Sequence, residues 1–303
     1  MRHFDYFVLD VFTDQVFGGN PLAVLPDARG LNTGEMQRIA REFNFSETAF
    51  VLPPESDDAT ARLRIFDPKN ELPFAGHPTV GTAICLAQQG SVFGQSISDY
   101  LVLDENVGPI ECAVANEDDL WSASFTTLAP FEYLDELPVD LVGKCLGLPT
   151  STVRTDGHAP IIVSKGLPFC VIELDSEADL ARIRIDQQAL RDAQRRFGPD
   201  EEPLALYVYS NQGDGGIAAR MFAPFSGIPE DPATGSAAAA LAALLCDVTE
   251  APVDLEIRQG AQMGRPSTIF AYAETQEGGV SLVSISGTAV TVMQGRMTLP
   301  ETG

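Results

Sequence analysis

The chain is short of positive charge. Its 303 residues include 19 Lys and Arg against 43 Asp and Glu, which gives a formal net charge of −24 at pH 7. Such a chain would repel a nucleic-acid backbone or an anionic membrane surface. We therefore expect no nucleic-acid partner and no membrane partner. An anionic substrate must instead be held by local dipoles or by a few arginines.

Long apolar runs and nucleotide-binding motifs are also missing. No segment approaches the ~18 apolar residues that a membrane helix needs, and Asp5 falls where a signal peptide would carry its apolar stretch. A cytoplasmic location is expected. The sequence contains neither GxGxxG nor a Walker motif, so nothing in it favours a nucleotide-binding fold.

Cysteine is sparse, and no two cysteines are close in sequence. The five are Cys85, Cys112, Cys145, Cys170 and Cys246. Without a CxxC pair, and with most of them inside apolar runs, they are expected to be buried reduced thiols rather than disulfides or zinc ligands.

The amino-acid composition predicts a globular protein of one large domain or two domains of ordinary size. Hydrophobic residues make up 45% of the chain and charged residues 20%, enough for each domain to bury its own core. Prolines, acids and one short helix are mixed between about residues 128 and 150, which is typical of a domain connection. We therefore expect domains at 1–128 and 129–303.

Two junctions of similar design organise the chain. In the first, Arg64-Ile65-Phe66-Asp67-Pro68 leads to an apolar helix over 78–88. In the second, the segment 220–236 leads to an apolar helix that reaches Cys246. Asp231-Pro232 is interpreted there as an N-cap followed by the residue best suited to the first helical position. A helix that is apolar nearly all round is expected to be buried on every side.

The junctions belong to a longer internal repeat. Asn32 and Asp186, each a predicted helix N-cap, are 154 positions apart, Arg64 and Arg220 are 156 apart, and Gly81 and Gly235 are 154 apart. Offsets that stay near half the chain length indicate a duplicated unit. We expect an α+β fold of two pseudo-symmetric halves, each a mostly antiparallel sheet around a buried helix.

The start of each buried helix is a candidate anion site. First-turn N–H groups have no intrahelical partner, so they could hold a carboxylate. Gly81 and Gly235 would let a ligand approach the backbone, and Thr82 and Ser236 would add hydroxyl donors. The alternative is that these residues only cap and pack the helices.

Three titratable residues are candidates for proton transfer. His77 lies at the first helix start, where the dipole should favour the neutral imidazole. Glu47, at the entrance of an apolar strand, could be a general base if partly desolvated. Asp231 could act likewise or could only cap the helix. For each of them, a purely structural role is the alternative.

Several blocks of sequence, in order along nearly the whole chain, resemble the PhzF-like phenazine biosynthesis family. They are Asp10-Val11-Phe12-Thr13, Gly19-Asn20-Pro21, Ser46-Glu47-Thr48-Ala49-Phe50-Val51, the segment 73–82, the segment 230–237, Gln259-Gly260 and Met263-Gly264-Arg265-Pro266-Ser267. The resemblance implies the diaminopimelate epimerase-like fold with a site between the halves. It also implies a homodimer, and the last strand could pair with the first half.

The resemblance also implies an activity. It points to a cofactor-independent isomerase of a small carboxylated metabolite, like trans-2,3-dihydro-3-hydroxyanthranilate isomerase, with no metal. Glu47 inherits the acid/base role, and His77 and Asp231 match other polar positions of the site. The expected substrate-binding residues are Gly76, Thr79, Gly235 and Ser236.

One departure separates this chain from two-thiol epimerases, which carry a cysteine at each junction. Here Ala75 stands at the first junction and Asp231-Pro232-Ala233 at the second, so thiolate racemisation is not expected. Two alternatives to the isomerase stay open. The first is a non-catalytic protein that binds a small molecule, and the second is an epimerase of another small acid.

Overall fold

The computed structural model describes residues 1–127, 129–199, 202–213, 216–276 and 279–301. The chain forms two compact units, Met1–Thr126 with Ser286–Gly303, and Thr127–Ile285. Residue 128, at the expected domain boundary, lies outside the described residues.

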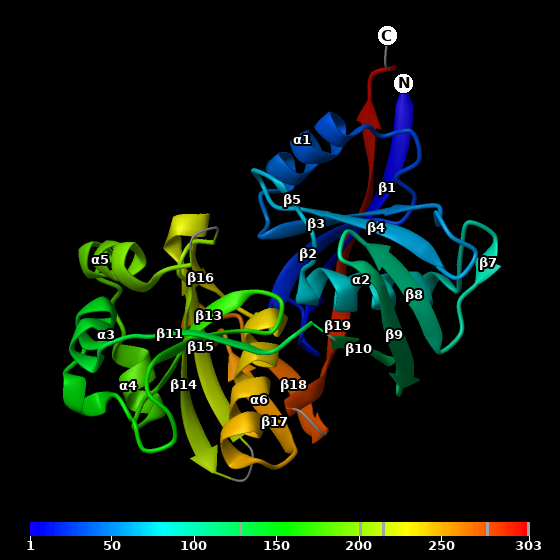
Figure 1. Ribbon diagram of the computed structural model, residues 1–303. Helices are drawn as coiled ribbons and strands as arrows, with labels where there is room; N and C mark the ends of the chain where they lie inside the picture. Colours follow the sequence, from blue (N-terminus) through cyan, green and yellow to red (C-terminus); the bar gives the residue numbers. More distant parts are fainter. Residues whose placement is uncertain (128, 200–201, 214–215, 277–278, 302–303) are drawn as a thin grey trace. The chain divides into compact units, whose positions relative to one another are not determined.

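The first unit is a curved sheet around one helix, with a second helix outside (Figure 1). Its strands are β1 (Arg2–Val11), β2 (Asn20–Leu25), β3 (Glu47–Leu52), β4 (Ala61–Phe66), β5 (Glu71–Leu72), β8 (Tyr100–Glu105), β9 (Gly108–Glu117), β10 (Leu120–Thr127) and the later part of β19 (Gly279–Leu299). The helices are α1 (Thr33–Phe43) and α2 (Gly76–Gln89), and β6 (Ser91–Val92) pairs with β7 (Gln95–Ser96) in a small hairpin.

The second unit repeats this plan. Its strands are β11 (Glu132–Glu136), β12 (Ile161–Ser164), β13 (Pro168–Glu173), β14 (Leu206–Gly213), β15 (Gly216–Ala223), β16 (Ile228–Asp231), β17 (Val253–Gln259), β18 (Ser267–Gln276) and the first part of β19. Its helices are α3 (Val139–Leu146), α4 (Glu177–Arg182), α5 (Gln187–Phe197) and α6 (Gly235–Thr249). Short 3₁₀ turns cover Thr150–Thr152, Pro224–Ser226 and Ala261–Met263.

The strand pairings confirm the predicted duplication. Along β1-β2-β3-β4-β8-β9 the pairs are antiparallel, parallel, antiparallel, parallel and antiparallel. Along β12-β13-β14-β15-β17-β18 the senses are the same. In the first unit β9 also pairs with β10, β10 with β19, and β19 with β1. The pairing of β19 with β1 is antiparallel. The expected fold of two similar halves, each a largely antiparallel sheet with a central helix, is therefore confirmed.

Each sheet encloses its central helix because that helix is apolar on every side. Every residue of α2 from Gly76 to Ala87 is buried, and α2 packs on β1, β2, β3, β8 and β9. In the second unit α6 packs on β12, β13, β17 and β18. Ser236, in the first turn of α6, is half-buried among otherwise buried neighbours.

The outer face of the first sheet is covered by α1. Met36, Ile39 and Ala40 are buried against Phe50 and other residues of the sheet. Burial of a large apolar side chain contributes roughly 1.5–3 kcal/mol. In the second unit the corresponding outer layer is built by α3, α4 and α5 over β13 and β14.

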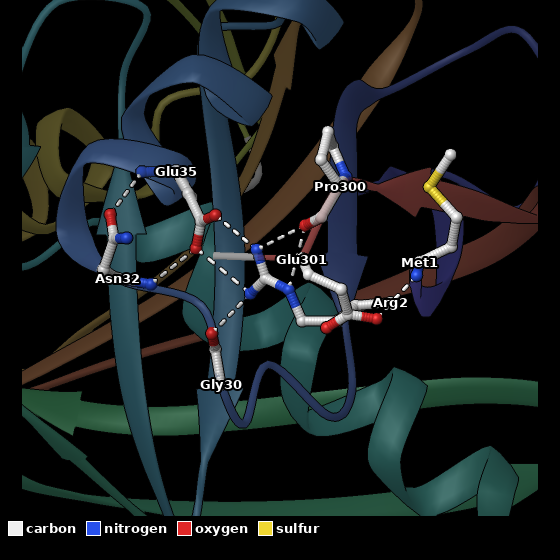
Figure 2. A network of polar contacts seen from close by, with 7 residues as sticks. All are labelled: Met1, Arg2, Gly30, Asn32, Glu35, Pro300 and Glu301. Atoms are coloured by element: carbon white, nitrogen blue, oxygen red, sulfur yellow. Dashed lines mark hydrogen bonds and ion pairs between the residues drawn. The ribbon is translucent and has the colours of Figure 1, made fainter. Parts of the chain in front are cut away.

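A polar network closes the start of α1 (Figure 2). The Asn32 side chain accepts from the Glu35 N–H at 3.0 Å, and Glu35 Oε2 accepts from the Asn32 N–H at 3.0 Å, which is a capping box at the predicted N-cap residue. The Arg2 guanidinium donates to Glu35 Oε1 at 2.5 Å and to the Gly30 carbonyl at 2.7 Å. It also donates to the Pro300 carbonyl, so β1, α1 and the end of β19 meet at one cation.

In each unit the repeated arginine forms an ion pair with a glutamate that follows it in the sequence. Arg64 forms two hydrogen bonds to Glu71, at 2.7 and 2.6 Å, and lies over the Phe66 ring. In the second unit, Arg220 forms two bonds of 2.8 Å to Glu230 and lies over the Phe222 ring. Both glutamates come from the short strand, β5 or β16, that follows the arginine strand.

The Asp-Pro steps do not cap the central helices, contrary to the interpretation of Asp231-Pro232. Asp231 is the last residue of β16, where it pairs with Met221, and α6 begins only at Gly235. The Gln259 side chain donates to the Asp231 carbonyl at 2.8 Å and holds this segment extended. Asp67 likewise accepts from the Lys69 and Asn70 N–H groups and forms the turn between β4 and β5.

All five cysteines are free and buried, as predicted. None of the helices within the described residues has both the length and the apolar character that a membrane crossing requires.

The capping box of α1 predicts a measurable loss. We expect Asn32→Ala to lower the free energy of unfolding by about 1 kcal/mol, because the Glu35 N–H loses its side-chain acceptor. Urea unfolding followed by circular dichroism measures this change. Asn32→Ser keeps a capping oxygen and should stay within a few tenths of a kcal/mol of wild type; an equal loss in both variants would contradict the cap.

Candidate active site

Two of the predicted catalytic residues meet inside the first unit. Glu47 is the first residue of β3, His77 is the second residue of α2, and α2 packs on β3. Glu47 Oε2 lies 3.4 Å from His77 Nε2, with the two side chains 13% and 5% exposed. A carboxyl group and an imidazole thus share a nearly enclosed position, at a distance that allows a proton to be exchanged after a small adjustment.

Asn20 orients the imidazole from its other side. Asn20 Nδ2 is 3.4 Å from His77 Nδ1, and Ser46 Oγ donates to Asn20 Oδ1 at 3.2 Å. Asn20 is only 1% exposed, because Gly19 turns the chain tightly into β2. A Cβ on Gly19 would lie 2.4 Å from the Val11 carbonyl oxygen, so only glycine fits there. Asn20 stands within one of the family-like motifs, but the sequence alone indicated no role for it.

His77 is neutral at physiological pH. Burial lowers the pKa of His77 to about 3, while a hydrogen bond with the Pro21 backbone acts in the opposite direction. The predicted direction is confirmed, but the cause is desolvation rather than the helix dipole, and the value lies far below pH 7. At pH 7 the group beside Glu47 is therefore an imidazole, which can donate or accept a proton at Nε2.

Both central helices begin without a side-chain cap. The N-cap residue is Ala75 in α2 and Thr234 in α6, and neither side chain bonds the first turn. The N–H groups of Gly76 and His77, and those of Gly235 and Ser236, are left at the positive ends of the helix dipoles. Each helix start can therefore hold an anionic group.

Neither of these two helix starts carries a cysteine that could act as a thiolate. The residue directly before the first helical glycine is Ala75 in one unit and Thr234 in the other. Burial raises the pKa of the Cys85 thiol to about 12 and that of Cys145 to about 11, so these thiols stay protonated. Among the described residues there is also no group of three or more His, Cys, Asp or Glu suited to a metal ion.

Asp231 is held by a chain of hydrogen bonds in the second unit. Thr234 Oγ1 donates to Asp231 Oδ2 at 2.5 Å, and Gln259 Nε2 donates to Thr234 Oγ1 at 3.0 Å. The order of donors makes the Asp231 carboxylate the final acceptor. Gly260 then approaches Pro232 so closely that a Cβ would lie 2.6 Å from its carbonyl oxygen. These contacts explain why Gln259-Gly260 accompanies the Asp231 motif.

Tyr207, on β14, is a further polar residue near Asp231 that the sequence did not reveal. It is fully buried, and its hydroxyl has no hydrogen-bond partner among the residues that the structure describes. Burial and the charge of Asp231 raise the pKa of Tyr207. In the sequence, Tyr207 stands inside an apolar strand and is indistinguishable from a core residue.

Gly81 and Thr82 are enclosed in the packing of α2, whereas the sequence interpretation placed a ligand beside them. A Cβ on Gly81 would lie 2.6 Å from Leu22 Cδ2 and 2.7 Å from Val11 Cγ2, so this glycine lets α2 approach the sheet. Thr82 is fully buried in the second turn of α2. Thr79 is also fully buried, and its hydroxyl contacts the Ala75 carbonyl and Glu105, so any effect on a substrate would pass through Ala75.

A protein-family model and two relatives each match almost the whole chain. The family model described as phenazine biosynthesis-like protein matches residues 9–295. Trans-2,3-dihydro-3-hydroxyanthranilate isomerase of Pseudomonas aeruginosa is 38% identical over 295 residues, which cover 96% of this chain and 98% of that enzyme. An uncharacterized isomerase of Mesorhizobium japonicum is 41% identical over 308 residues, which cover 98% of this chain and 99% of that protein.

A solved structure has the same fold. A phenazine biosynthesis protein of the PhzF family from Bacillus anthracis aligns with a TM-score of 0.84 and 23% identity, over 99% of this chain and 100% of that one. At this identity the likeness establishes the fold, which is the diaminopimelate epimerase-like fold expected from the sequence.

The close approach of α2 to the sheet predicts the effect of one methyl group. We expect Gly81→Ala to lower the free energy of unfolding by about 1–3 kcal/mol through overpacking against Leu22 and Val11. Gly34→Ala is the matched control, since a Cβ there meets only Asn32 Oδ1 at 3.4 Å, and alanine should be neutral or stabilising in α1. Urea unfolding measures both variants. A loss in Gly34→Ala as large as in Gly81→Ala would contradict this packing.

The neutral state of His77 predicts how stability depends on pH. The folded pKa of about 3 lies below the ordinary value of 6.5, so below pH 6.5 the unfolded chain binds a proton that the folded chain does not. The contribution of His77 is present above pH 6.5 and is lost as the pH falls toward 3. Between pH 7 and pH 5 wild type should lose about 2 kcal/mol more than His77→Asn. Unfolding at both pH values measures this difference, and equal losses would contradict it.

Proposed function

The chain belongs to the phenazine biosynthesis-like (PhzF) family, and on that premise we propose that it is a cofactor-independent isomerase of a small carboxylated metabolite. The proposed substrate is trans-2,3-dihydro-3-hydroxyanthranilate or a close analogue, because the Pseudomonas aeruginosa isomerase of that compound is 38% identical over almost the whole chain. An isomerisation returns every atom and electron to the same molecule, so proton transfer alone is sufficient chemistry.

The observation that carries this proposal is the contact between Glu47 Oε2 and His77 Nε2 at 3.4 Å in a nearly enclosed position. Glu47 is proposed as the base that removes a proton from a substrate carbon and returns it to another carbon. The neutral His77 holds the carboxyl group in place or relays the proton. Desolvation strengthens both interactions, because water competes poorly for these groups.

The remaining predicted residues are proposed to bind the substrate. The uncapped N–H groups of Gly76 in α2, and of Gly235 and Ser236 in α6, offer donors to a carboxylate. The half-buried Ser236 adds a hydroxyl group. Asp231, held by Thr234 and Gln259, is proposed as a further proton acceptor or an anchor for a substrate amine or hydroxyl. A homodimer is proposed from the family resemblance.

Removal of the base should abolish most of the activity. We expect Glu47→Gln to lower kcat/KM on trans-2,3-dihydro-3-hydroxyanthranilate about 10²–10⁴-fold, because glutamine keeps the shape of glutamate but cannot accept the proton. In D₂O, wild type should place deuterium on a substrate carbon, detected by mass spectrometry. Glu47→Gln should not.

The control variant is Glu42→Gln, since Glu42 is an exposed residue of α1. It should keep wild-type rates. If the activity of Glu47→Gln stayed within tenfold of wild type, Glu47 would not be the base. A wild type that binds the compound without deuterium exchange would favour a binding protein, and exchange at one carbon with inversion would favour an epimerase.

A further inference from the structure

One acid in the first unit is buried with no role in the proposed chemistry. Glu105, the last residue of β8, is 2% exposed, and within the described part of the chain its Oε2 atom has no hydrogen-bond partner. Its other oxygen, Oε1, lies 2.7 Å from Thr79 Oγ1. Thr79 is in the first turn of α2, close in sequence to Gly76 and His77. Glu105 therefore contacts the first turn of the helix whose start is proposed to bind the substrate.

The Thr79 hydroxyl has two close oxygen neighbours but one proton. Besides Glu105 Oε1, the Ala75 carbonyl oxygen lies 2.8 Å from Thr79 Oγ1. A carbonyl oxygen can only accept, so a hydrogen bond to Ala75 uses the hydroxyl proton. The contact with Glu105 is then a hydrogen bond only if the carboxyl group supplies a proton itself. The geometry thus favours a neutral carboxylic acid that donates to Thr79.

The charges around Glu105 do not neutralise a carboxylate. The groups that act on it are Arg62 of β4, Asp104 of β8 and Cys112 of β9. Arg62 is bound to the Asp104 carbonyl and to Asn106, and lies 3.6 Å from Asp104 Oδ2. Burial dominates and raises the pKa of Glu105 to about 8, against smaller lowering by Thr79 and Arg62. An unpaired carboxylate would be costly in this position.

The Ala75 carbonyl links this acid to the helix start. It accepts from the Thr79 N–H at 3.2 Å and from the Thr79 hydroxyl at 2.8 Å. In a trans peptide the N–H of the next residue points opposite to the carbonyl. Two bonds on the Ala75 oxygen therefore fix the direction of the Gly76 N–H, which points out of the helix toward any bound anion.

We propose that Glu105 is a positioning residue that keeps its proton, donates it to Thr79, and through Thr79 and Ala75 aims the Gly76 N–H at the substrate carboxylate. Its effect on catalysis rests on the proposed function, whereas its effect on Gly76 does not. When Glu105 loses its proton, the carboxylate must accept from Thr79. The hydroxyl then turns away from Ala75, and a negative charge lies close behind the anion-binding end of α2.

The Gly76 amide signal in nuclear magnetic resonance tests the proposal without a substrate. Between pH 6 and pH 9.5 this signal should shift in wild type with a midpoint near 8. In Glu105→Gln it should stay fixed, because an amide donates to Thr79 at every pH. No shift in wild type, or the same shift in Glu105→Gln, would overturn the proposal. Failure of the isomerase proposal would leave this titration unchanged.

Kinetics supply the second readout. Above pH 8, KM for trans-2,3-dihydro-3-hydroxyanthranilate should rise in wild type but not in Glu105→Gln. Glu105→Leu has no donor, so its KM should be about tenfold higher even at pH 7, with kcat within threefold of wild type. A fall in kcat at constant KM would mean a merely structural role and would overturn the proposal. Should Glu105→Leu fail to fold, the comparison of wild type with Glu105→Gln still decides.

Discussion

A helix that is apolar on all sides must be enclosed, and an enclosed helix leaves its first N–H groups without water. This constraint accounts for much of the molecule. It explains why each unit wraps a sheet around one helix, and why the first N–H groups of that helix need a hydrogen-bond partner. The N-cap residues Ala75 and Thr234 do not cap these helices with their side chains, so a bound anion is proposed to accept from the first-turn N–H groups.

Local signals in the sequence were sufficient wherever neighbours along the chain decide the structure. Asn32 and Glu35 bond each other across three residues, so the cap of α1 could be predicted from their spacing. The repeat was visible from offsets of 154 to 156 residues, and in each unit the repeated arginine pairs with a glutamate of the strand that follows, Arg64 with Glu71 and Arg220 with Glu230. The fold followed from these features together with the family resemblance.

Contacts between distant residues set the limit of prediction. Asp231-Pro232 has the appearance of a helix cap, but Gln259, 28 residues further on, holds Asp231 in a strand instead. Gly81 looked like a place for a ligand, yet Leu22 and Val11 occupy the space beside it. Glu105 and Tyr207 gave no signal at all, since only the fold shows that they are buried beside Thr79 and near Asp231.

The segment between the repeated arginine and the helix is three residues longer in the second unit, from Arg220 to Gly235, than in the first, from Arg64 to Gly76. The two repeated units therefore differ at the starts of their central helices. One copy follows its helix glycine with an imidazole, and the other follows it with a hydroxyl and places an acid four residues earlier. An enzyme that inverts a centre gains from equal chemistry in both copies. The proposed isomerisation moves a proton between two different atoms, so it does not require the same residues at both helix starts.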